Sequence, residues 1–402
     1  MITNPEVPLA INSLHELDIE AATKVLNSGK LTMGEITQEF ETKMAEYLGV
    51  RHFLFCNSGS SANLLLLEAL VRPLEGQHKL NVGDYVAVPS IAWPTTVWPI
   101  IQLGLVPIFF DVSESTLAID IDAILKYKNP TGKRIDAAFV IHPLGFPIPR
   151  QELEKLSQAG ILLLEDTCES LGAKSSGHLA GTTGIAGTYS FYFSHHMTTM
   201  EGGGIATNDG ALYSDLKCIR SHGWSRESSY LSTQNLQKDP KFTFVASGFN
   251  MRPMEIQSTI GLSQLSRLEI NLAKRIKLAE LIATNLEGTS FKVLGKESRF
   301  STSQSTDRHT WMFIPIMIES KTQLSEIRSY LQENAIETRP ALTGNFVNQP
   351  ASRFFPNETN SKDIFPVANR IEECVFLVGC SPDYSEQQID HLSRILVSAS
   401  KL

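Results

Sequence analysis

Short, continuous apolar runs separated by helical patterns constrain the fold of this 402-residue chain more than any other feature. Six runs rich in β-branched and aromatic residues lie between about residues 45 and 210: Tyr85–Pro89, 106–112, 137–142, 161–166, 188–193 and 204–207. Because polar residues do not alternate within them, they are typical of strands covered on both faces. Helical patterns over 60–70, 120–126 and 150–159 separate several of these runs. This alternation predicts an α/β fold with a large, mostly parallel sheet.

The pattern of expected secondary structure changes in the second half of the sequence. A polar stretch from about 225 to 250 precedes a long helical pattern over 254–286, which is long enough to link two domains. Shorter mixed elements follow, with a strand expected over 310–319 and a helix over 323–333. At roughly 100–200 residues per domain, the length suits one large and one small domain. We therefore predict a large α/β domain over residues 1–255, and a linking helix with a small α+β domain over 256–402.

Composition excludes several classes of protein. The chain has 35 Lys+Arg against 43 Asp+Glu, a net charge of -8, and 42% hydrophobic residues, as in a soluble globular protein. Without a basic run, nucleic acid and anionic membrane are not expected as partners. Neither a signal peptide nor an apolar run of about 18 residues is visible, so we expect a cytoplasmic protein.

The five cysteines, at positions 56, 168, 218, 374 and 380, are scattered along the chain. An odd, dispersed set fits reduced thiols better than a disulfide framework. It also lacks the close grouping typical of zinc or iron–sulfur ligation, so we expect no metal.

The segment 57–63, NSGSSAN, precedes an apolar helical run. Small residues at a helix start leave backbone N–H groups open, and with the helix dipole they form a site suited to a phosphate. The alternative is an ordinary serine N-cap.

Asp166 ends the apolar run 161–166, and Glu169 follows three residues later. The carboxyl ends of parallel strands are where open α/β sheets bind ligands. A carboxylate there could coordinate a metal, act as a base or pair with a protonated heterocycle nitrogen. Capping of the next helix is an equally good interpretation.

Paired histidines follow the next apolar run, in the segment 190–204 (SFYFSHHMTTMEGGG). His195 and His196 lie in a polar turn, and the three glycines permit close backbone approach. Histidines are more often structural than functional, and adjacent ones project in different directions, which disfavours a metal site. Trp93, after another run, could stack on a flat ligand or lie in the core.

Several loop-like clusters offer donors for an anionic substrate, although each could also be a solvated turn. They contain His222, Arg226, Arg252 and Arg339. Arginine binds carboxylates and phosphates through two parallel hydrogen bonds, so these residues are candidates for contacts with an anionic ligand.

Taken in order, these motifs resemble the sugar aminotransferase family of fold-type-I pyridoxal-phosphate enzymes, over about residues 20–395. The resemblance implies pyridoxal 5'-phosphate or pyridoxamine 5'-phosphate as cofactor and an aspartate aminotransferase-like fold. It implies cofactor-binding roles for residues of the motifs above: Gly59, Ser60 and Ser190 at the phosphate, Trp93 on the pyridine ring, Asp166 at the pyridine nitrogen, and Glu169 beside it, where Gln is usual.

The resemblance also implies a homodimer with shared active sites. Gly248-Phe249-Asn250 resembles a segment that brings Asn250 to the phosphate from the other subunit.

One departure from the family pattern decides the subclass. The pattern is Ser-Phe, three residues, Lys, five residues, Glu-Gly-Gly, and here His195 occupies the lysine position. Imidazole cannot form the stable Schiff base that a lysine amine forms with the cofactor. With histidine in this position, the chain resembles the family's 3-dehydratase branch. Enzymes of this branch remove the C3 hydroxyl from nucleotide-linked 4-keto-6-deoxyhexoses. Three segments are most similar to family members that act on GDP-4-keto-6-deoxymannose: the one around His195, the segment HGWSR and the segment ETRP. A related dehydratase uses an iron–sulfur cluster, and the scattered cysteines disfavour that enzyme.

This resemblance implies that L-glutamate converts the cofactor to its amine form and that His195 serves as base and acid, for which a near-neutral pKa would suit it. The products would be ammonia and a 3,6-dideoxy-4-keto sugar. Two alternatives stay open: a nucleotide-sugar 4-aminotransferase that lacks the usual lysine, and a catalytically inactive cofactor-binding regulator.

Overall fold

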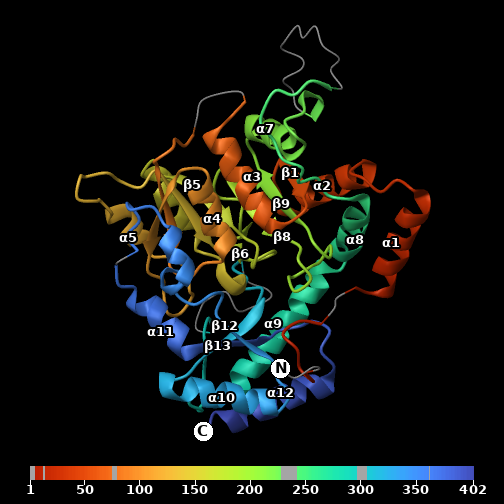
Figure 1. Cartoon of the computed structure of the whole chain (residues 1–402). Coiled ribbons are helices and arrows are strands. Elements are labelled where there is room, and N and C mark those ends of the chain that lie inside the picture. The colour runs from red at the N-terminus through yellow and green to blue at the C-terminus, as the bar shows by residue number, and fades with distance from the viewer. Residues whose placement is uncertain (1–4, 12–13, 75–78, 228–241, 297–305, 362) are drawn as a thin grey trace.

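Two sheets organise the computed structural model, which describes residues 5–11, 14–74, 79–227, 242–296, 306–361 and 363–402 (Figure 1). The larger sheet has seven strands in the order β1-β9-β8-β5-β4-β2-β3. These strands are β1 (His52–Cys56), β2 (Tyr85–Pro89), β3 (Val106–Phe110), β4 (Ala137–Ile141), β5 (Leu162–Asp166), β8 (Ala186–Ser190) and β9 (Gly203–Thr207).

The seven-stranded sheet is mostly parallel, as predicted. Strand β9 pairs antiparallel with both β1 and β8, whereas the pairs among β8, β5, β4, β2 and β3 are all parallel. Every residue of β2, β3, β4 and β9 is buried, which explains their continuous apolar sequences. Because β9 runs in the opposite direction, its first residue lies at the same edge as the carboxyl ends of β1 and β8.

Helices cover both faces of this sheet. Helix α3 packs on β8 and β9, α4 on β2 and β3, α6 on β5, and α7 on β1 and β9. The helices of this part are α1 (Glu16–Ser28), α2 (Glu35–Leu48), α3 (Gly59–Val71), α4 (Pro94–Gln102), α5 (Ile121–Lys126), α6 (Arg150–Gln158) and α7 (Gly210–Arg220). A two-stranded hairpin, β6 (Lys174–Ser175) with β7 (His178–Leu179), follows β5.

The smaller sheet, in the lower part of Figure 1, is antiparallel with the order β10-β11-β13-β12. Its strands are β10 (Lys292–Val293), β11 (Phe313–Met317), β12 (Thr338–Pro340) and β13 (Val375–Gly379). The helices α10 (Lys321–Glu333), α11 (Pro366–Cys374) and α12 (Glu386–Ala399) accompany it. The predicted strand 310–319 and helix 323–333 correspond to β11 and α10.

The long helix expected over 254–286 is two helices, α8 (Glu255–Leu265) and α9 (Leu268–Asn285). No proline or glycine causes the break. Arg267, between the helices, has φ -115 and ψ 5, and its guanidinium Nη1 donates to Asp18 Oδ1 of α1 at 2.9 Å. This ion pair with a buried carboxylate is a tertiary contact that periodicity alone does not predict.

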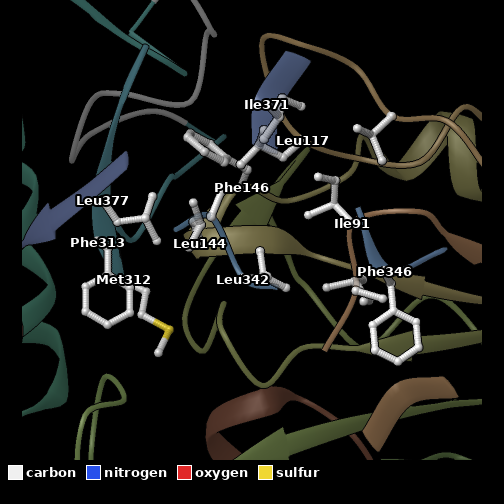
Figure 2. Close-up of a cluster of buried hydrophobic side chains, with 14 of the residues drawn as sticks. Ile91, Leu117, Leu144, Phe146, Met312, Phe313, Leu342, Phe346, Ile371 and Leu377 are labelled. Carbon is white, nitrogen blue, oxygen red and sulfur yellow. The ribbon is translucent and has the colours of Figure 1, made fainter. Parts of the chain in front are cut away.

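The apolar side chains between the two sheets belong to one continuous core cluster. Figure 2 shows part of it, with side chains from the β2–β4 half of the chain facing side chains around β11–β13. The labelled residues are Ile91, Leu117, Leu144, Phe146, Met312, Phe313, Leu342, Phe346, Ile371 and Leu377. The domain boundary predicted at 255/256 falls at the start of α8 and stays a prediction.

Candidate active site

A cavity of about 660 Å³, measured to its open mouth, lies at the carboxyl edge of the seven-stranded sheet. Residues from both sides of the core line it. Eight of the twelve residues predicted from the sequence are among them: Gly59, Ser60, Trp93, Asp166, Glu169, Ser190, His195 and Arg339.

The start of helix α3 forms one end of the cavity. The N-cap is Ser58, whose Oγ accepts a hydrogen bond from Ser61 N at 3.0 Å. The N–H groups of Gly59 and Ser60 have no acceptor among the described residues, so they are available to a ligand. Ser58 therefore caps the helix, as one interpretation of NSGSSAN expects, and the phosphate site at the next two residues stays a prediction.

Glycine is required where the chain segments meet around this helix start. A Cβ atom on Gly59 would lie 2.6 Å from Ser190 Cβ, so a larger residue would push the helix away from β8. A Cβ atom on Gly203, at the start of β9, would overlap the backbone of Ser58 and Gly59. The close approach explains the glycines after Glu201 in the sequence.

Asp166 ends β5 and is held by donors from two other elements. Its Oδ2 accepts from Asn63 Nδ2 at 2.9 Å and from Thr96 Oγ1 at 2.7 Å, and its Oδ1 accepts from Cys168 N at 3.1 Å. Asn63 Oδ1 in turn accepts from Thr188 Oγ1 at 2.6 Å, which orients the amide so that its NH₂ faces the carboxylate. These donors suit an ionised carboxylate at the cavity wall.

Glu169 lies beside Asp166 and accepts from Leu144 N at 3.0 Å through Oε2. Burial raises the pKa of the Glu169 carboxyl, and the charge of Asp166 adds to this shift, while Arg339 and the Leu144 amide oppose it. The Glu169 carboxyl therefore ionises less readily than an exposed glutamate does.

Trp93 and Arg339 face the cavity from opposite sides of the core. Trp93, the N-cap of α4, is 47% exposed, so the alternative of a core tryptophan is wrong. Arg339 comes from β12, and its guanidinium lies 5.9 Å from the centre of the Trp93 ring. Among the described residues that line the cavity, Arg339 is the only Lys or Arg. It is therefore the arginine placed to bind an anionic group there.

His195 lies in the turn between β8 and β9, where its N–H donates to Tyr192 O at 3.0 Å. The pKa of the ring is lowered to about 4, chiefly by burial; a hydrogen bond with the backbone of Cys168 opposes this shift, and the charges of Arg275 and Arg339 add to it. The near-neutral pKa expected from the sequence is wrong, because that expectation ignored burial. At neutral pH the ring is uncharged and can accept a proton.

The second histidine of the pair has a different environment. His196 is buried, with Nε2 3.2 Å from Thr310 O, and it does not line the cavity. The two side chains project in different directions, as expected for neighbouring residues in a turn. His195 is thus the histidine placed for chemistry.

Four predicted residues do not line this cavity: Asn250, His222, Arg226 and Arg252. The Oδ1 atom of Asn250 accepts from Arg252 Nε at 3.1 Å on the surface. The backbone N–H of His222 donates to Phe249 O at 2.6 Å, and the Arg226 guanidinium lies 3.6 Å from the centre of the Trp224 ring. Their roles in binding stay predictions.

Sequence reasoning missed nine lining residues: Asn63, Thr95, Thr96, Ile141, Cys168, Tyr192, Ser194, Met312 and Leu342. Five of them, Asn63, Cys168, Tyr192, Ser194 and Thr95, lie within or next to motifs that the sequence analysis singled out. Met312 and Leu342 come from the other side of the core, beside Phe313 and Leu144 in Figure 2. No local pattern marks these two, because only the packing of the two sheets brings them here.

The model of the DegT/DnrJ/EryC1/StrS aminotransferase family matches residues 12–397. The chain belongs to this family. A GDP-4-keto-6-deoxy-D-mannose 3-dehydratase of Yersinia pseudotuberculosis is 36% identical over 358 residues, which are 87% of this chain and 88% of that protein.

Two solved structures of relatives are also similar. An Escherichia coli GDP-4-keto-6-deoxy-D-mannose-3-dehydratase with bound hydrated PLP has a TM-score of 0.88 at 32% identity, covering 98% of this chain and 100% of that chain. A GDP-4-keto-6-deoxymannose-3-dehydratase with a trapped PLP-glutamate geminal diamine has a TM-score of 0.87 at 32% identity, covering 97% and 100%. The predicted aminotransferase-like fold is confirmed.

Two further properties of the described residues complete the site. None of their helices is both long and apolar enough to cross a membrane. All five cysteines are free thiols, and within the described ranges no three His, Cys, Asp or Glu side chains gather as metal ligands would.

Proposed function

We propose that this protein is a PLP/PMP-dependent 3-dehydratase of nucleotide-linked 4-keto-6-deoxy sugars, with GDP-4-keto-6-deoxymannose as substrate and L-glutamate as amino donor. The observation that carries the proposal is that His195 lines the cavity beside Asp166, and that no lysine is among the described lining residues. A lysine-anchored aminotransferase needs an amine at this place. The named substrate and the glutamate adduct of the family members support this choice.

The cavity residues fit the cofactor that the family implies. The open N–H groups of Gly59 and Ser60, at a helix N-terminus, suit its phosphate, and Ser190 lies against them. Trp93 offers an exposed aromatic face to a flat ring. Asp166, already supplied with three donors, can hold a proton on a ring nitrogen through its remaining lone pairs.

When bound in its amine form, this cofactor supplies the nitrogen that condenses with the C4 ketone of the sugar and the electron sink that lets the C3–O bond break. Asp166 keeps the pyridine nitrogen protonated, because an ionised carboxylate favours the charged form of its partner. Trp93 would stack on the ring and exclude water from one of its faces.

His195 moves the proton that dehydration needs. Its side chain lines the cavity beside Asp166, where the ring can reach a bound ligand. The neutral ring would accept a proton from the C4′ carbon of the bound cofactor and pass it to the departing C3 oxygen, which would leave as water. Because the pKa of the buried ring is about 4, the protonated ring is a strong acid, and it gives the proton up readily.

The remaining predictions complete the proposal. We infer a homodimer in which Asn250 reaches the partner's phosphate site, which accounts for its exposed position outside the cavity of its own chain. Arg339, together with His222, Arg226 and Arg252, would bind the diphosphate or the glutamate carboxylates. We further infer a cytoplasmic enzyme with a domain boundary at 255/256.

Product analysis tests the proposal against its rivals. With L-glutamate and GDP-4-keto-6-deoxymannose, the enzyme should release ammonia and 2-oxoglutarate and form a 3,6-dideoxy-4-keto sugar. A 4-amino sugar without ammonia would instead indicate a 4-aminotransferase. An absorbance spectrum that glutamate leaves unchanged would indicate an inactive cofactor-binding protein. The same assay with a CDP-linked 4-keto-6-deoxy sugar tests the choice of nucleotide.

A chemical test addresses the missing lysine directly. Borohydride reduction of the cofactor-loaded protein should leave every lysine unmodified, because His195 forms no stable imine. A pyridoxyl adduct on any lysine, found by peptide mass spectrometry, would refute the assignment of His195 to the lysine position.

A further inference from the structure

Arg275 of α9 is a buried cation placed directly behind the His195 turn. It is 5% exposed, and its guanidinium donates only to backbone carbonyl groups. Nη1 donates to Cys380 O at 2.6 Å and Met312 O at 3.2 Å, and Nη2 lies 3.4 Å from His195 O. One side chain thus joins the turn after β8 to the segment before β11 and the end of β13.

These contacts cross between the two sheets at the cavity. Met312 lines the cavity and belongs to the core cluster drawn in Figure 2, whereas His195 belongs to the seven-stranded side. The planar fork of an arginine can reach several carbonyl groups at once, which a lysine ammonium on a single stem cannot do equally well. Arg275 therefore fixes the position of the His195 backbone relative to the small sheet.

No carboxylate lies within ion-pair distance of Arg275 in the described part of the chain; burial lowers the pKa of its guanidinium, and the more distant charge of Asp383 opposes this shift. The other buried arginines differ in this respect. Arg220 pairs with Glu41 at 2.6 Å, and Arg308 pairs with Glu269 at 2.5 Å. A buried guanidinium without a counter-charge disfavours any second positive charge nearby.

We propose that Arg275 is a positioning residue for His195, holding its turn against the β11–β13 sheet with a guanidinium that forms no direct ion pair among the described residues. The catalytic role of this positioning rests on the proposed function, whereas the contacts of Arg275 are observed whatever the function is. Arg275 would then have two separable effects on His195, one through the hydrogen bonds of its guanidinium and one through its positive charge.

The charge of Arg275 favours the neutral form of the His195 ring. Burial is the largest cause of the low pKa of His195, and Arg275 lowers it further, as does Arg339. The other titratable groups around the ring are Tyr192 and His196 of the same turn, Cys168 after β5, and the carboxyl groups of Asp166 and Glu169 in the cavity wall. The two carboxyl groups act in the opposite sense to Arg275, since negative charge favours a protonated ring.

Two substitutions separate the effects. Arg275→Lys keeps the positive charge but loses the guanidinium hydrogen bonds, and Arg275→Met loses both the charge and the hydrogen bonds. Arg308→Met is the matched control, because it removes a buried arginine that also contacts α9 through Glu269 but has no contact with His195. The first measurement is the titration of the His195 ring by NMR in protein with labelled histidine, without substrate, with the signal assigned from its loss in His195→Asn.

We expect the titration midpoint of His195 to rise by about one pH unit in Arg275→Met and to stay in place in Arg275→Lys and Arg308→Met. The second measurement is kcat for ammonia release, which should fall by about 10-fold in Arg275→Lys, because the turn loses its anchor. A wild-type midpoint in folded Arg275→Met, or a wild-type kcat in Arg275→Lys, overturns the proposal. If the wild-type protein releases no ammonia while the midpoint still rises in Arg275→Met, the proposed function fails and the effect of Arg275 on His195 stands.

Discussion

Asn63 Nδ2 and Asp166 Oδ2 lie 2.9 Å apart, across 103 positions of sequence. The contact joins the first turns of α3, where a phosphate would bind, to the carboxylate at the end of β5. Two subsites that the sequence analysis treated separately are therefore one rigid assembly. Thr188 on β8 completes it by fixing the orientation of the Asn63 amide.

Thr96→Val and Thr188→Val test this assembly. Thr96→Val removes a direct donor to Asp166, so we expect cofactor affinity to fall by about 10-fold, as for loss of a hydrogen bond to a charged group. Thr188→Val only frees the Asn63 amide to rotate, so its effect should be smaller. The dissociation constant of the cofactor, from absorbance titration, measures both.

Thr182→Val serves as the control, since its hydroxyl donates to Leu179 O in the turn after β7, outside the cavity lining. It should bind the cofactor as the wild type does. Wild-type affinity in Thr96→Val would contradict the role assigned to this donor.

Much of this site could be predicted from the sequence, because the motifs are local. Asp166 and Ser190 end buried strands, and Gly59 starts a helix, so periodicity and turn chemistry were enough to place them at one edge of the sheet. The strand β1 has a similar apolar sequence but is not among the six runs that the sequence analysis singled out.

Other features depend on contacts between distant segments. Arg275 lies in the middle of an amphipathic helix, where a single arginine is usually an exposed residue, and only the packing of β11 and β13 buries it. The break before α9 has the same origin, because the ion pair with Asp18 forms only after α1 has docked. The low pKa of His195 also follows from burial, which the sequence around a turn does not reveal.

Acid should destabilise the folded chain before its carboxylates titrate. Burial lowers the pKa of His195 to about 4, and it lowers the pKa of His196 and of His309 well below the ordinary value. Below about pH 6.5 the unfolded chain binds protons that these folded rings do not. The free energy of unfolding should therefore fall as the pH drops from 7 to 5, by up to about 1.4 kcal/mol per pH unit for each ring within its window.

Urea unfolding at pH 5, 6 and 7 measures this slope, and His196→Gln isolates one contribution. The glutamine amide can replace the contact with Thr310 O but does not titrate. We expect a shallower slope in this variant. An unchanged slope would show that His196 is not a neutral buried ring in the folded protein.

Arg339 should control the binding of anionic substrates. As the one Lys or Arg among the described cavity residues, it is placed to bind a glutamate carboxylate or the sugar nucleotide. We expect Arg339→Met to raise KM for at least one of these two substrates by about 10-fold or more, because a charge-assisted bidentate contact is lost.

The matched control for this prediction is Arg328→Met. Arg328 donates to Thr338 Oγ1, one residue before Arg339 in β12, but it lies outside the cavity. Its KM values should stay at the wild-type level. Equal KM values for Arg339→Met and Arg328→Met would remove Arg339 from the binding site.

Subunit complementation tests the proposed homodimer and the role of Asn250 together. If each site combines His195 of one chain with Asn250 of the other, His195→Asn and Asn250→Asp should each be inactive, the first for want of a proton acceptor and the second by repulsion of the phosphate. In a hybrid dimer, however, one of the two sites combines wild-type His195 with wild-type Asn250. After co-refolding in equal amounts, half of the dimers are hybrids, so about a quarter of the wild-type activity should return.

Two results distinguish this arrangement from its alternatives. Refolding each variant alone should restore no activity, and the hybrid should form only after unfolding or slow subunit exchange. If both residues act within one chain, the hybrid contains one site with each defect and the mixture stays inactive. Because Asn250 is exposed and its Oδ1 accepts only from Arg252 among the described residues, the substitution should leave the monomer folded, and circular dichroism before and after mixing checks this directly.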